Sequence, residues 1–504
     1  MTIVFRVDAS STIGTGHVMR CLTLAKELEK QGAKCKFICR DLKDNLIEKI
    51  KTENFKVSIL NNSKIYSNWL GEDYNEDAFQ TINALNNEVV DWLIIDHYGI
   101  EKKWEKKLRP AVRNIMVIDD LANRDHDCDL LLDQNLVHNF KIRYQDILPK
   151  SCNTLLGPEY ALLQREYKNF HTAAPTRIGP TKNILVYFGG INYYHLTELV
   201  LNAFLSLKRK DIFLNIVISS NSPDKKKILE LSNHYKNIKI ISNLISLAPL
   251  MLKADLSIGA CGATTWERCC LGLPSLVITV AENQRQIAKE LNKQGIIHWL
   301  GHHDKITKKS ICKALKNNID QNLETWSKAC KLITDGKGAL KVATNITLNY
   351  KTKLKARSAN KKDEALLLKW ANDPLVRRKS FNPNIIMPEA HHEWFYTRIK
   401  NSKICKIVIV ETKEALSIGQ VRIEKEKDKW MINFSLADFA RKKKIGTKML
   451  NTALKKFISM GITDFFAKVK QDNKASCQVF KNAGFKKKTS TNDNFITFFY
   501  QNKL

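Results

Sequence analysis

Residues 1–30 (MTIVFRVDASSTIGTGHVMRCLTLAKELEK) begin with a short apolar run, continue through a loop with two glycines and end in a helical pattern. The run at residues 3–7 is typical of a buried strand, and apolar residues recur at helical spacing from Val18 to Leu28. Further buried strands are predicted at residues 35–39, 57–60, 92–96 and 115–119. This alternation indicates an α/β fold with a parallel sheet.

The same pattern restarts after residues 171–180 (HTAAPTRIGP), where two prolines and the lack of apolar periodicity predict an interdomain linker. A helix is predicted over residues 196–207. Strands are predicted at residues 184–188, 214–218, 238–241, 256–258 and 276–280. Two successive Rossmann-like halves predict a two-domain enzyme that binds its ligands in a cleft at the carboxyl ends of the strands.

The character of the sequence changes after about residue 348, where helices and strands no longer alternate regularly. Helices are predicted at residues 363–371, 388–400, 446–459 and 474–483. Strands are predicted at residues 404–411, 418–423, 430–435, 464–470 and 495–500, and the lysine run 486–488 is expected to be a solvated turn. A separate α+β domain follows, so the expected domains are residues 1–173, 181–347 and 353–504.

Composition excludes several classes of protein. With 504 residues, 44% of them hydrophobic and 26% charged, the chain is an ordinary globular sequence of about three domains, neither disordered nor fibrous. No apolar run is long enough to span a membrane, and no secretory signal is recognisable, so a cytoplasmic location is predicted. The 12 cysteines form no CxxC pair, which favours reduced thiols over a zinc site or a disulfide framework.

The formal net charge of +31 suggests nucleic-acid binding, but its distribution does not support it. Residues 351–504 hold 34 Lys and Arg against 14 Asp and Glu, and most of these lysines are scattered. No nucleic-acid-binding motif accompanies them, so we expect a lysine-rich solvated surface and no nucleic-acid partner.

Two loops have the composition of phosphate or sugar sites. In residues 10–17 (SSTIGTGH), Gly14 and Gly16 allow close approach of a ligand to the backbone, and His17 stands at the helix start. A helix N-terminus disfavours an imidazolium, so His17 is expected to be neutral and able to accept a proton; alternatively it only caps the helix. The loop is not a dinucleotide fingerprint, because Met19 occupies the third glycine position.

The second loop, residues 259–265 (GACGATT), places small residues and hydroxyls before another predicted helix. Gly262, Thr264 and Thr265 could cradle a phosphate, and Glu267 could accept ribose hydroxyls; a tight turn with capping threonines is the alternative. Polar side chains also follow three strands of the first half, at residues 96–98, 119–120 and 133–135. They are expected to converge on one cleft, with Asp119 as a loop anchor and no metal site.

Five ordered motifs carry a family resemblance. They are residues 6–20 (RVDASSTIGTGHVMR), 95–98 (IDHY), 118–121 (IDDL), 133–135 (DQN) and 254–284 (ADLSIGACGATTWERCCLGLPSLVITVAENQ). Over roughly residues 1–340 the chain resembles the UDP-sugar hydrolases of pseudaminic acid biosynthesis, which remove UDP from UDP-2,4-diacetamido-2,4,6-trideoxy-β-L-altropyranose. That family in turn resembles the GT-B glycosyltransferases. One departure is visible: residues 189–192 (GGIN) lack the aspartate that usually follows the two glycines.

The resemblance implies hydrolysis at the anomeric carbon with inversion, without metal or cofactor. His17 would activate water, and Tyr98 would position sugar or water. It implies substrate contacts from Asp8, Gly14, Gly16, Arg20, Asp96, Asn135, Gly262, Thr264, Thr265, Glu267, Asn283 and Gln284. It also suggests functional association with other enzymes of that pathway. An inverting GT-B glycosyltransferase and an inactive UDP-sugar-binding scaffold remain the alternatives.

Chemistry supports this interpretation independently. UDP is a good leaving group, so a helix N-terminus that stabilises the developing diphosphate charge suffices for its departure. The reaction then needs a nucleophile, which a neutral histidine supplies by deprotonating water.

Residues 353–504 resemble the GNAT N-acetyltransferases, in particular those that acetylate the 4-amino group of the UDP-sugar one step earlier. Matching segments are residues 370–374 (WANDP), 380–382 (SFN), 392–395 (HEWF) and 418–420 (IGQ), together with Arg377 and the stretch 473–485. The resemblance implies acetyl-CoA as cofactor, with contacts from Arg441, Lys444, Gly446, Thr447 and Asn473.

Two departures leave the activity of this domain open between a working and a degenerate acetyltransferase. In residues 441–446 (RKKKIG), Lys444 replaces the first glycine of the pyrophosphate turn, and a Cβ there can obstruct a phosphate. Phe480 stands where a tyrosine often protonates the departing thiolate. His391 and His392, beside Trp394 and Phe395, are expected mainly to pack.

Overall fold

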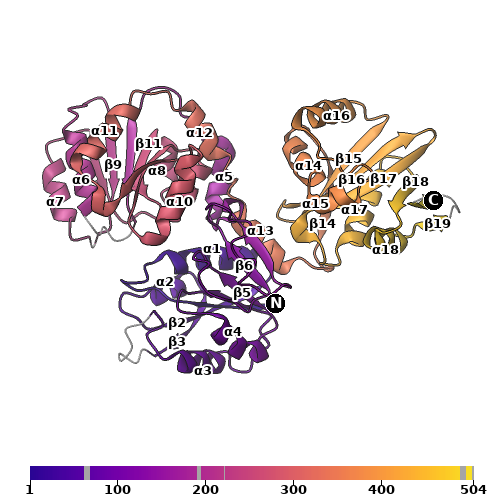
Figure 1. Ribbon diagram of the computed structural model, residues 1–504, viewed down its shortest axis with the longest axis horizontal. Coiled ribbons are helices and arrows are strands. Elements are labelled where there is room, and N and C mark those ends of the chain that lie inside the picture. Colours follow the sequence, from indigo (N-terminus) through magenta and orange to yellow (C-terminus); the bar gives the residue numbers. More distant parts are fainter. Residues whose placement is uncertain (62–68, 190–194, 221, 489–494, 502–504) are drawn as a thin grey trace. The chain divides into compact units, whose positions relative to one another are not determined.

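The computed structural model describes residues 1–61, 69–189, 195–220, 222–488 and 495–501. It contains two compact units, Met1–Ala343 and Thr344–Leu504. The first unit holds two parallel sheets and the second holds a mixed sheet (Figure 1). The predicted order, two Rossmann-like α/β halves followed by an α+β domain, is confirmed.

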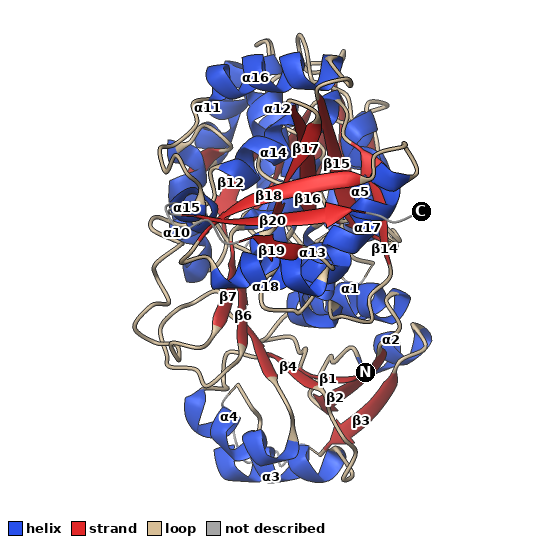
Figure 2. Cartoon of the chain, turned by 90° about the vertical axis from the view of Figure 1, so that its right-hand side faces the viewer, coloured by secondary structure: helices blue, strands red, loops and turns tan. Residues whose placement is uncertain are grey.

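The first sheet has the strand order β3-β2-β1-β4-β5-β6-β7, with every neighbouring pair parallel. Its strands are β1 (Thr2–Val7), β2 (Lys34–Arg40), β3 (Lys56–Leu60), β4 (Trp92–Asp96), β5 (Ile115–Ile118), β6 (Leu130–Asp133) and β7 (Asn153–Leu156). Figure 2 shows α3 (Tyr74–Ala84) and α4 (Lys102–Leu108) on one side of this sheet, opposite α1 (Gly16–Lys30) and α2 (Ile47–Thr52). The order reverses between β1 and β4, so the loops after these two strands diverge and leave room for a ligand.

The second sheet has the order β10-β9-β8-β11-β12-β13, again parallel throughout. Its strands are β8 (Asn183–Tyr187), β9 (Phe213–Val217), β10 (Ile238–Ile241), β11 (Leu256–Ala260), β12 (Ser275–Thr279) and β13 (His298–His302). Alternate strand residues face opposite layers of helices. One layer is α6 (Leu196–Leu205), α7 (Lys225–Ser232) and α11 (Lys308–Asn318). The other is α8 (Ala248–Lys253), α9 (Thr264–Cys270), α10 (Glu282–Lys293) and α12 (Glu324–Lys331).

The segment predicted as a linker is more ordered than expected. Its first three residues belong to α5 (Arg165–Ala173). Beyond the helix, Arg177 is buried and donates to the backbone carbonyls of Ala254 at 3.1 Å and Met251 at 2.8 Å. The helix ends before Pro175, and the side chain of Arg177 then holds the segment against the second half through these hydrogen bonds.

The second unit begins within α13 (Gly338–Thr347), and its sheet has the order β14-β15-β16-β17-β18-β20-β19. The strands are β14 (Leu354–Ser358), β15 (Cys405–Thr412), β16 (Ser417–Glu426), β17 (Lys429–Leu436), β18 (Asp464–Lys470), β19 (Lys486–Lys488) and β20 (Phe495–Gln501). The helices are α14 (Glu364–Ala371), α15 (Pro374–Lys379), α16 (Pro388–Lys400), α17 (Gly446–Ile458) and α18 (Lys474–Asn482). The solvated turn expected at residues 486–488 is wrong, because these lysines pair with β20 as an exposed edge strand.

β17 and β18 are the one parallel pair described in this sheet. They pair only where Trp430 lies beside Phe465 and Met431 beside Phe466. Beyond these residues no further pairing joins the described parts of the two strands, so a gap opens in the sheet.

Candidate active sites

His17 lies at the centre of the polar cluster in the first unit. Its Nδ1 is 2.6 Å from Oδ1 of Asp96, and its side chain is 10% exposed. Arg20, one helical turn further along α1, binds both oxygens of Asp96 at 2.6 Å. Burial alone would raise the pKa of Asp96, but its pairing with Arg20 and His17 holds that pKa well below the usual range. A charged Asp96 favours the tautomer of His17 that carries its proton on Nδ1, in which Nε2 is the basic nitrogen.

The fold brings these residues together through the switch between β1 and β4. Val7 and Asp96 are opposite one another at the ends of the two paired strands. After β1 the chain turns at Gly14, whose φ of +81° favours glycine, and its N–H donates to the Ser10 carbonyl at 2.8 Å. The turn starts α1 at Gly16, which places His17 over the end of β4. The expectation that His17 is neutral stays a prediction.

Tyr98 lies beside His17 and links the two halves of the unit. Its ring meets the His17 ring edge-on, with centroids 4.7 Å apart, and its hydroxyl donates to Asp120 at 2.6 Å. Asn283, at the start of α10, donates to the same hydroxyl at 3.3 Å. Burial and the Asp120 carboxylate raise the pKa of Tyr98, so the hydroxyl remains protonated.

Other predicted contacts of the first half are buried within the fold. Asp8 is fully buried, pairs with Arg6 at 2.8 Å and accepts the backbone N–H of Arg40 at 2.7 Å. Asn135 is 6% exposed, and its backbone N–H donates to Asp133 at 2.9 Å. Burial raises the pKa of Asp133 to about 7. The structure thus places Asp8 inside the fold, paired with Arg6 and the backbone of Arg40.

The second predicted loop lies between β11 and α9. Gly259 is required there, because a Cβ would lie 2.3 Å from the Tyr187 carbonyl oxygen. Gly262 has open space around its Cα, whereas Thr265 is buried and accepts from Arg268 at 3.0 Å. The Thr265 hydroxyl therefore points inward, and Thr264 next to it remains partly exposed.

Three further predicted contacts surround this loop. Burial raises the pKa of Glu267 to about 7, although a hydrogen bond from Tyr167 opposes the shift. Gln284 accepts the backbone N–H of Val280 at 2.9 Å, and Asn283 is exposed apart from its contact with Tyr98. The departure noted at residues 190–192 lies outside the described residues.

The structure adds two residues to the His17 site. Asp120 was expected only as one of the polar side chains that follow the strands, and Trp69 was not predicted. Asp120 binds both Tyr98 and Arg20, the latter at 3.3 Å. Trp69 packs edge-on against Tyr98 with centroids 5.3 Å apart. Asp120 had a signal, since it follows a strand end beside Asp119. Asp119 itself accepts the Ala122 N–H at 2.8 Å, which confirms it as a loop anchor.

In the second unit, the turn at residues 441–446 has a backbone conformation that glycine favours, although Lys444 replaces the glycine. Lys442 and Lys444 both have positive φ, +61° and +54°. Such φ values are rare for residues with a Cβ, and they let successive N–H groups point to one side of a turn. The turn thus has a backbone conformation that glycine favours, and the obstruction of a phosphate by the Cβ of Lys444 stays a prediction.

Replacing Lys444 by glycine should raise the free energy of unfolding by about 1 kcal/mol. The left-handed backbone conformation is unfavourable for a residue with a Cβ, and removing that cost outweighs the extra backbone entropy that glycine loses on folding. Urea unfolding of the full chain measures the change. Lys443→Gly is the matched control, since Lys443 has no positive φ and should only lose stability. A destabilised Lys444→Gly variant would contradict the assigned strain.

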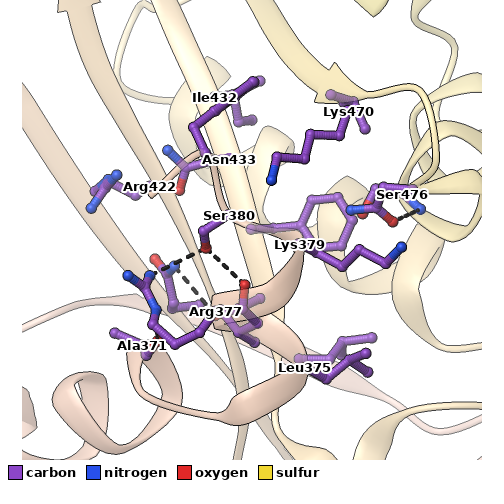
Figure 3. Close-up of a pocket in the computed structure, with 18 of the residues that line it drawn as sticks. Ala371, Leu375, Arg377, Lys379, Ser380, Arg422, Ile432, Asn433, Lys470 and Ser476 are labelled. Atoms are coloured by element: carbon purple, nitrogen blue, oxygen red, sulfur yellow. Dashed lines mark hydrogen bonds between the residues drawn. The ribbon is translucent and has the colours of Figure 1, made fainter. Parts of the chain in front are cut away.

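A cavity of about 720 Å³ lies between β17, β18 and the helices α14–α16 of the second unit (Figure 3). Of the predicted cofactor contacts, Arg441 and Asn473 line it. Asn473 also caps α18 by accepting the Ser476 N–H at 3.2 Å. Lys444, Gly446 and Thr447 lie in the turn and at the start of α17, outside the lining. Phe480 lines the cavity, and its ring centroid lies 5.0 Å from that of Phe485. As a phenylalanine it has no hydroxyl to protonate the departing thiolate.

The described residues contain neither a membrane-spanning helix nor a cluster of metal-ligating side chains. None of the described helices combines the length and apolar character needed to cross a membrane. No group of three or more His, Cys, Asp or Glu in the described part of the chain could hold a metal ion.

Comparison with known proteins agrees with the division of the chain into the units Met1–Ala343 and Thr344–Leu504. Residues 183–340 match the glycosyltransferase family 28 C-terminal domain, and residues 353–486 match the acetyltransferase (GNAT) domain. The crystal structure of MurG from Acinetobacter baumannii shares 14% identity and has a TM-score of 0.50, covering 68% of this chain and 98% of its own. The first unit therefore has a GT-B-like fold.

Two relatives extend the comparison. The UDP-2,4-diacetamido-2,4,6-trideoxy-beta-L-altropyranose hydrolase of Campylobacter jejuni is 28% identical, over 58% of this chain and 97% of its own. An uncharacterised protein of Methanocaldococcus jannaschii is 26% identical over 98% of both chains. Both predicted resemblances are confirmed: this chain is an enzyme that joins a GT-B-like region, homologous to UDP-sugar hydrolases, to a GNAT domain.

Proposed function

We propose that the first unit hydrolyses UDP-2,4-diacetamido-2,4,6-trideoxy-β-L-altropyranose to UDP and the free sugar, with inversion at the anomeric carbon. The observation that carries the proposal is the 2.6 Å contact between His17 Nδ1 and Asp96. It supports an imidazole with Nδ1 protonated and Nε2 as the basic nitrogen, the arrangement that a catalytic histidine needs. The homology to the Campylobacter jejuni hydrolase supplies the substrate.

In the proposed reaction, Nε2 of His17 takes a proton from water as the water oxygen attacks the anomeric carbon. The bond between that carbon and the diphosphate oxygen breaks, and UDP keeps the electron pair. Tyr98, held by Asp120 and Asn283, positions the sugar or the water. Attack opposite the departing UDP gives inversion.

UDP is proposed to bind to Gly262, Thr264 and Glu267, with further contacts from Asn283 and Gln284. Open space at Gly262 supports approach of a phosphate to the backbone. Glu267, with a pKa of about 7, can exchange hydrogen bonds with ribose hydroxyls in either protonation state. The hydrolase then comprises two proposed domains, residues 1–173 and 181–347, with residues 353–504 as the third.

A second activity, acetyl transfer from acetyl-CoA to the 4-amino precursor of this UDP-sugar, is proposed for the second unit. Two observations favour it over a degenerate domain. The turn 441–446 keeps its backbone path through Lys442 and Lys444, and a large cavity opens where β17 and β18 diverge. Acetyl-CoA supplies the acetyl group; Arg441 and Asn473 at the cavity, with Gly446 and Thr447 at the start of α17, are its proposed contacts.

The proposed hydrolysis is tested with the full chain and its UDP-sugar. UDP should form at the same rate with and without EDTA, because no metal-ligating group is invoked and no sugar acceptor is needed. A rate that requires an added acceptor would favour the glycosyltransferase alternative, and a rate abolished by EDTA would contradict the metal-independent mechanism. Release of free thiol from acetyl-CoA with the 4-amino precursor tests the acetyl transfer.

A further inference from the structure

Arg268 is a buried arginine next to the loop that joins β11 to α9. The residue is 3% exposed. Its Nη2 donates to the Ala260 carbonyl at 2.7 Å and to the Thr265 hydroxyl at 3.0 Å. Ala260 ends β11 and Thr265 lies in the first turn of α9, so one nitrogen binds both ends of the loop 261–264. The guanidinium therefore lies against the buried side of this loop.

The end of β11 leaves room for this side chain. A Cβ on Gly259 would lie 2.6 Å from Nη1 of Arg268, so glycine is needed where the guanidinium passes. The loop itself reaches solvent, since Ala263 is exposed and Gly262 and Thr264 are half-buried. A ligand on the exposed part of the loop is thus separated from the guanidinium by the loop alone.

The positive charge of Arg268 has no permanent counter-charge. In the described part of the chain no carboxylate forms an ion pair with it, and its buried Nε has no hydrogen-bond partner. The adjacent Glu267 acts on it through its charge, but burial raises the pKa of Glu267 to about 7, so this carboxylate is not fully ionised at neutral pH. Burial lowers the pKa of Arg268, yet an arginine stays protonated at neutral pH. A buried charge without a partner costs free energy, which a bound anion can offset.

A second buried arginine of the same half shows the contacts of a purely structural role. Arg177 is also 3% exposed and forms no ion pair with a described carboxylate. All three of its guanidinium nitrogens donate to backbone carbonyls. Arg268 uses only one of its three nitrogens in this way. Hydrogen bonds within the fold therefore account for Arg177 but only in part for Arg268.

We propose that Arg268 attracts the diphosphate of UDP from behind the loop 261–264 and makes this site prefer two phosphates over one. The inference rests on the UDP site proposed above. Charges several ångströms apart interact strongly inside a protein, where salt and water screen them little. The attraction grows with the charge of the ligand, so it acts most on UDP, less on UMP and not on uridine.

The same charge favours the departure of UDP in the proposed hydrolysis. When the bond between the anomeric carbon and the diphosphate oxygen breaks, the diphosphate keeps the electron pair and gains one negative charge. A fixed cation stabilises that charge as it develops and lowers the barrier without a proton donor. Arg268 itself forms no bond and supplies no proton in this step.

The affinities of the full chain for UDP and UMP, measured by calorimetry, test the proposal. Arg268→Gln removes the charge but keeps an amide that can donate to the Ala260 carbonyl. Its Kd for UDP should rise about 10-fold and its Kd for UMP about 3-fold, so the preference for UDP should fall about 3-fold. Arg268→Lys keeps the charge and should keep most of the preference. Arg268→Met, which is uncharged and apolar, gives the same comparison if the glutamine variant does not fold.

Arg177→Gln is the matched control, because it removes an equally buried arginine from the same half and should leave the preference unchanged. Equal losses for UDP and UMP in Arg268→Gln would overturn the role of Arg268, since a merely structural residue affects both ligands alike. Binding needs no turnover, so the two proposals can fail separately. A reduced preference without hydrolysis by the wild-type chain supports Arg268 and contradicts the hydrolysis. Hydrolysis with an unchanged preference overturns Arg268 alone, and absence of UDP binding to the wild-type chain contradicts both.

Discussion

Replacing His17 by alanine should lower the rate of UDP release by about 10²–10⁴-fold, because the variant has no group to take the proton from water. Affinity for UDP should survive, since the proposed UDP contacts lie in the second half of the unit. Turnover is measured as UDP formed and affinity by calorimetry. His138→Ala, at an exposed histidine of the same unit, is the control and should retain activity. Unchanged turnover in His17→Ala would remove His17 from its assigned role.

The second large effect is expected at Asp96. Asparagine keeps the shape of the side chain but carries no charge, and its amide can donate to Nδ1 of His17. The imidazole then holds its proton on Nε2 and cannot act as a base, so kcat should fall about 10²–10⁴-fold with little change in KM. Arg20 also loses the carboxylate that binds it twice at 2.6 Å, which should cost about 3–5 kcal/mol of stability.

A double mutant distinguishes positioning from mere loss of structure. If Asp96 acts through His17, Asp96→Asn should reduce the rate little further in a His17→Ala background, because the group that it orients is already absent. Thermal unfolding of each variant checks that enough protein is folded for the comparison. If the two substitutions lowered the rate independently, so that their fold-losses multiplied in the double mutant, the orienting role of Asp96 would be contradicted.

Local patterns in the sequence were sufficient to predict the central strands of both parallel sheets, but not the edge strands β7 and β13. Buried strands of four to seven residues stand out as apolar runs, and α1 follows its periodicity from Val18 to Leu28. The convergence of His17 and Asp96 was also predictable, because parallel strands end at the same edge of a sheet. A local sequence pattern does not predict side-chain contacts between residues far apart in the chain. The hydrogen bond from Asn283 to Tyr98, which lie 185 residues apart, is one such contact.

Other differences have local causes that a sequence pattern does not reveal. Lys444 suggested an obstructed turn, but its backbone adopts a positive φ that lysine tolerates at some cost. Residues 486–488 have no apolar side chain to mark a strand, yet they pair through their backbone at the sheet edge. His391 was expected to pack, and its ring does pack against Trp394 and Phe395.

The position of the oxygen taken from water tests the central claim most directly. When the UDP-sugar is hydrolysed by the full chain in ¹⁸O-labelled water, the account predicts one ¹⁸O atom on the anomeric carbon of the released sugar and none in UDP. That result follows from attack by the water that His17 deprotonates. Label in the phosphate of UDP would mean that the phosphorus–oxygen bond breaks instead, which would contradict the mechanism.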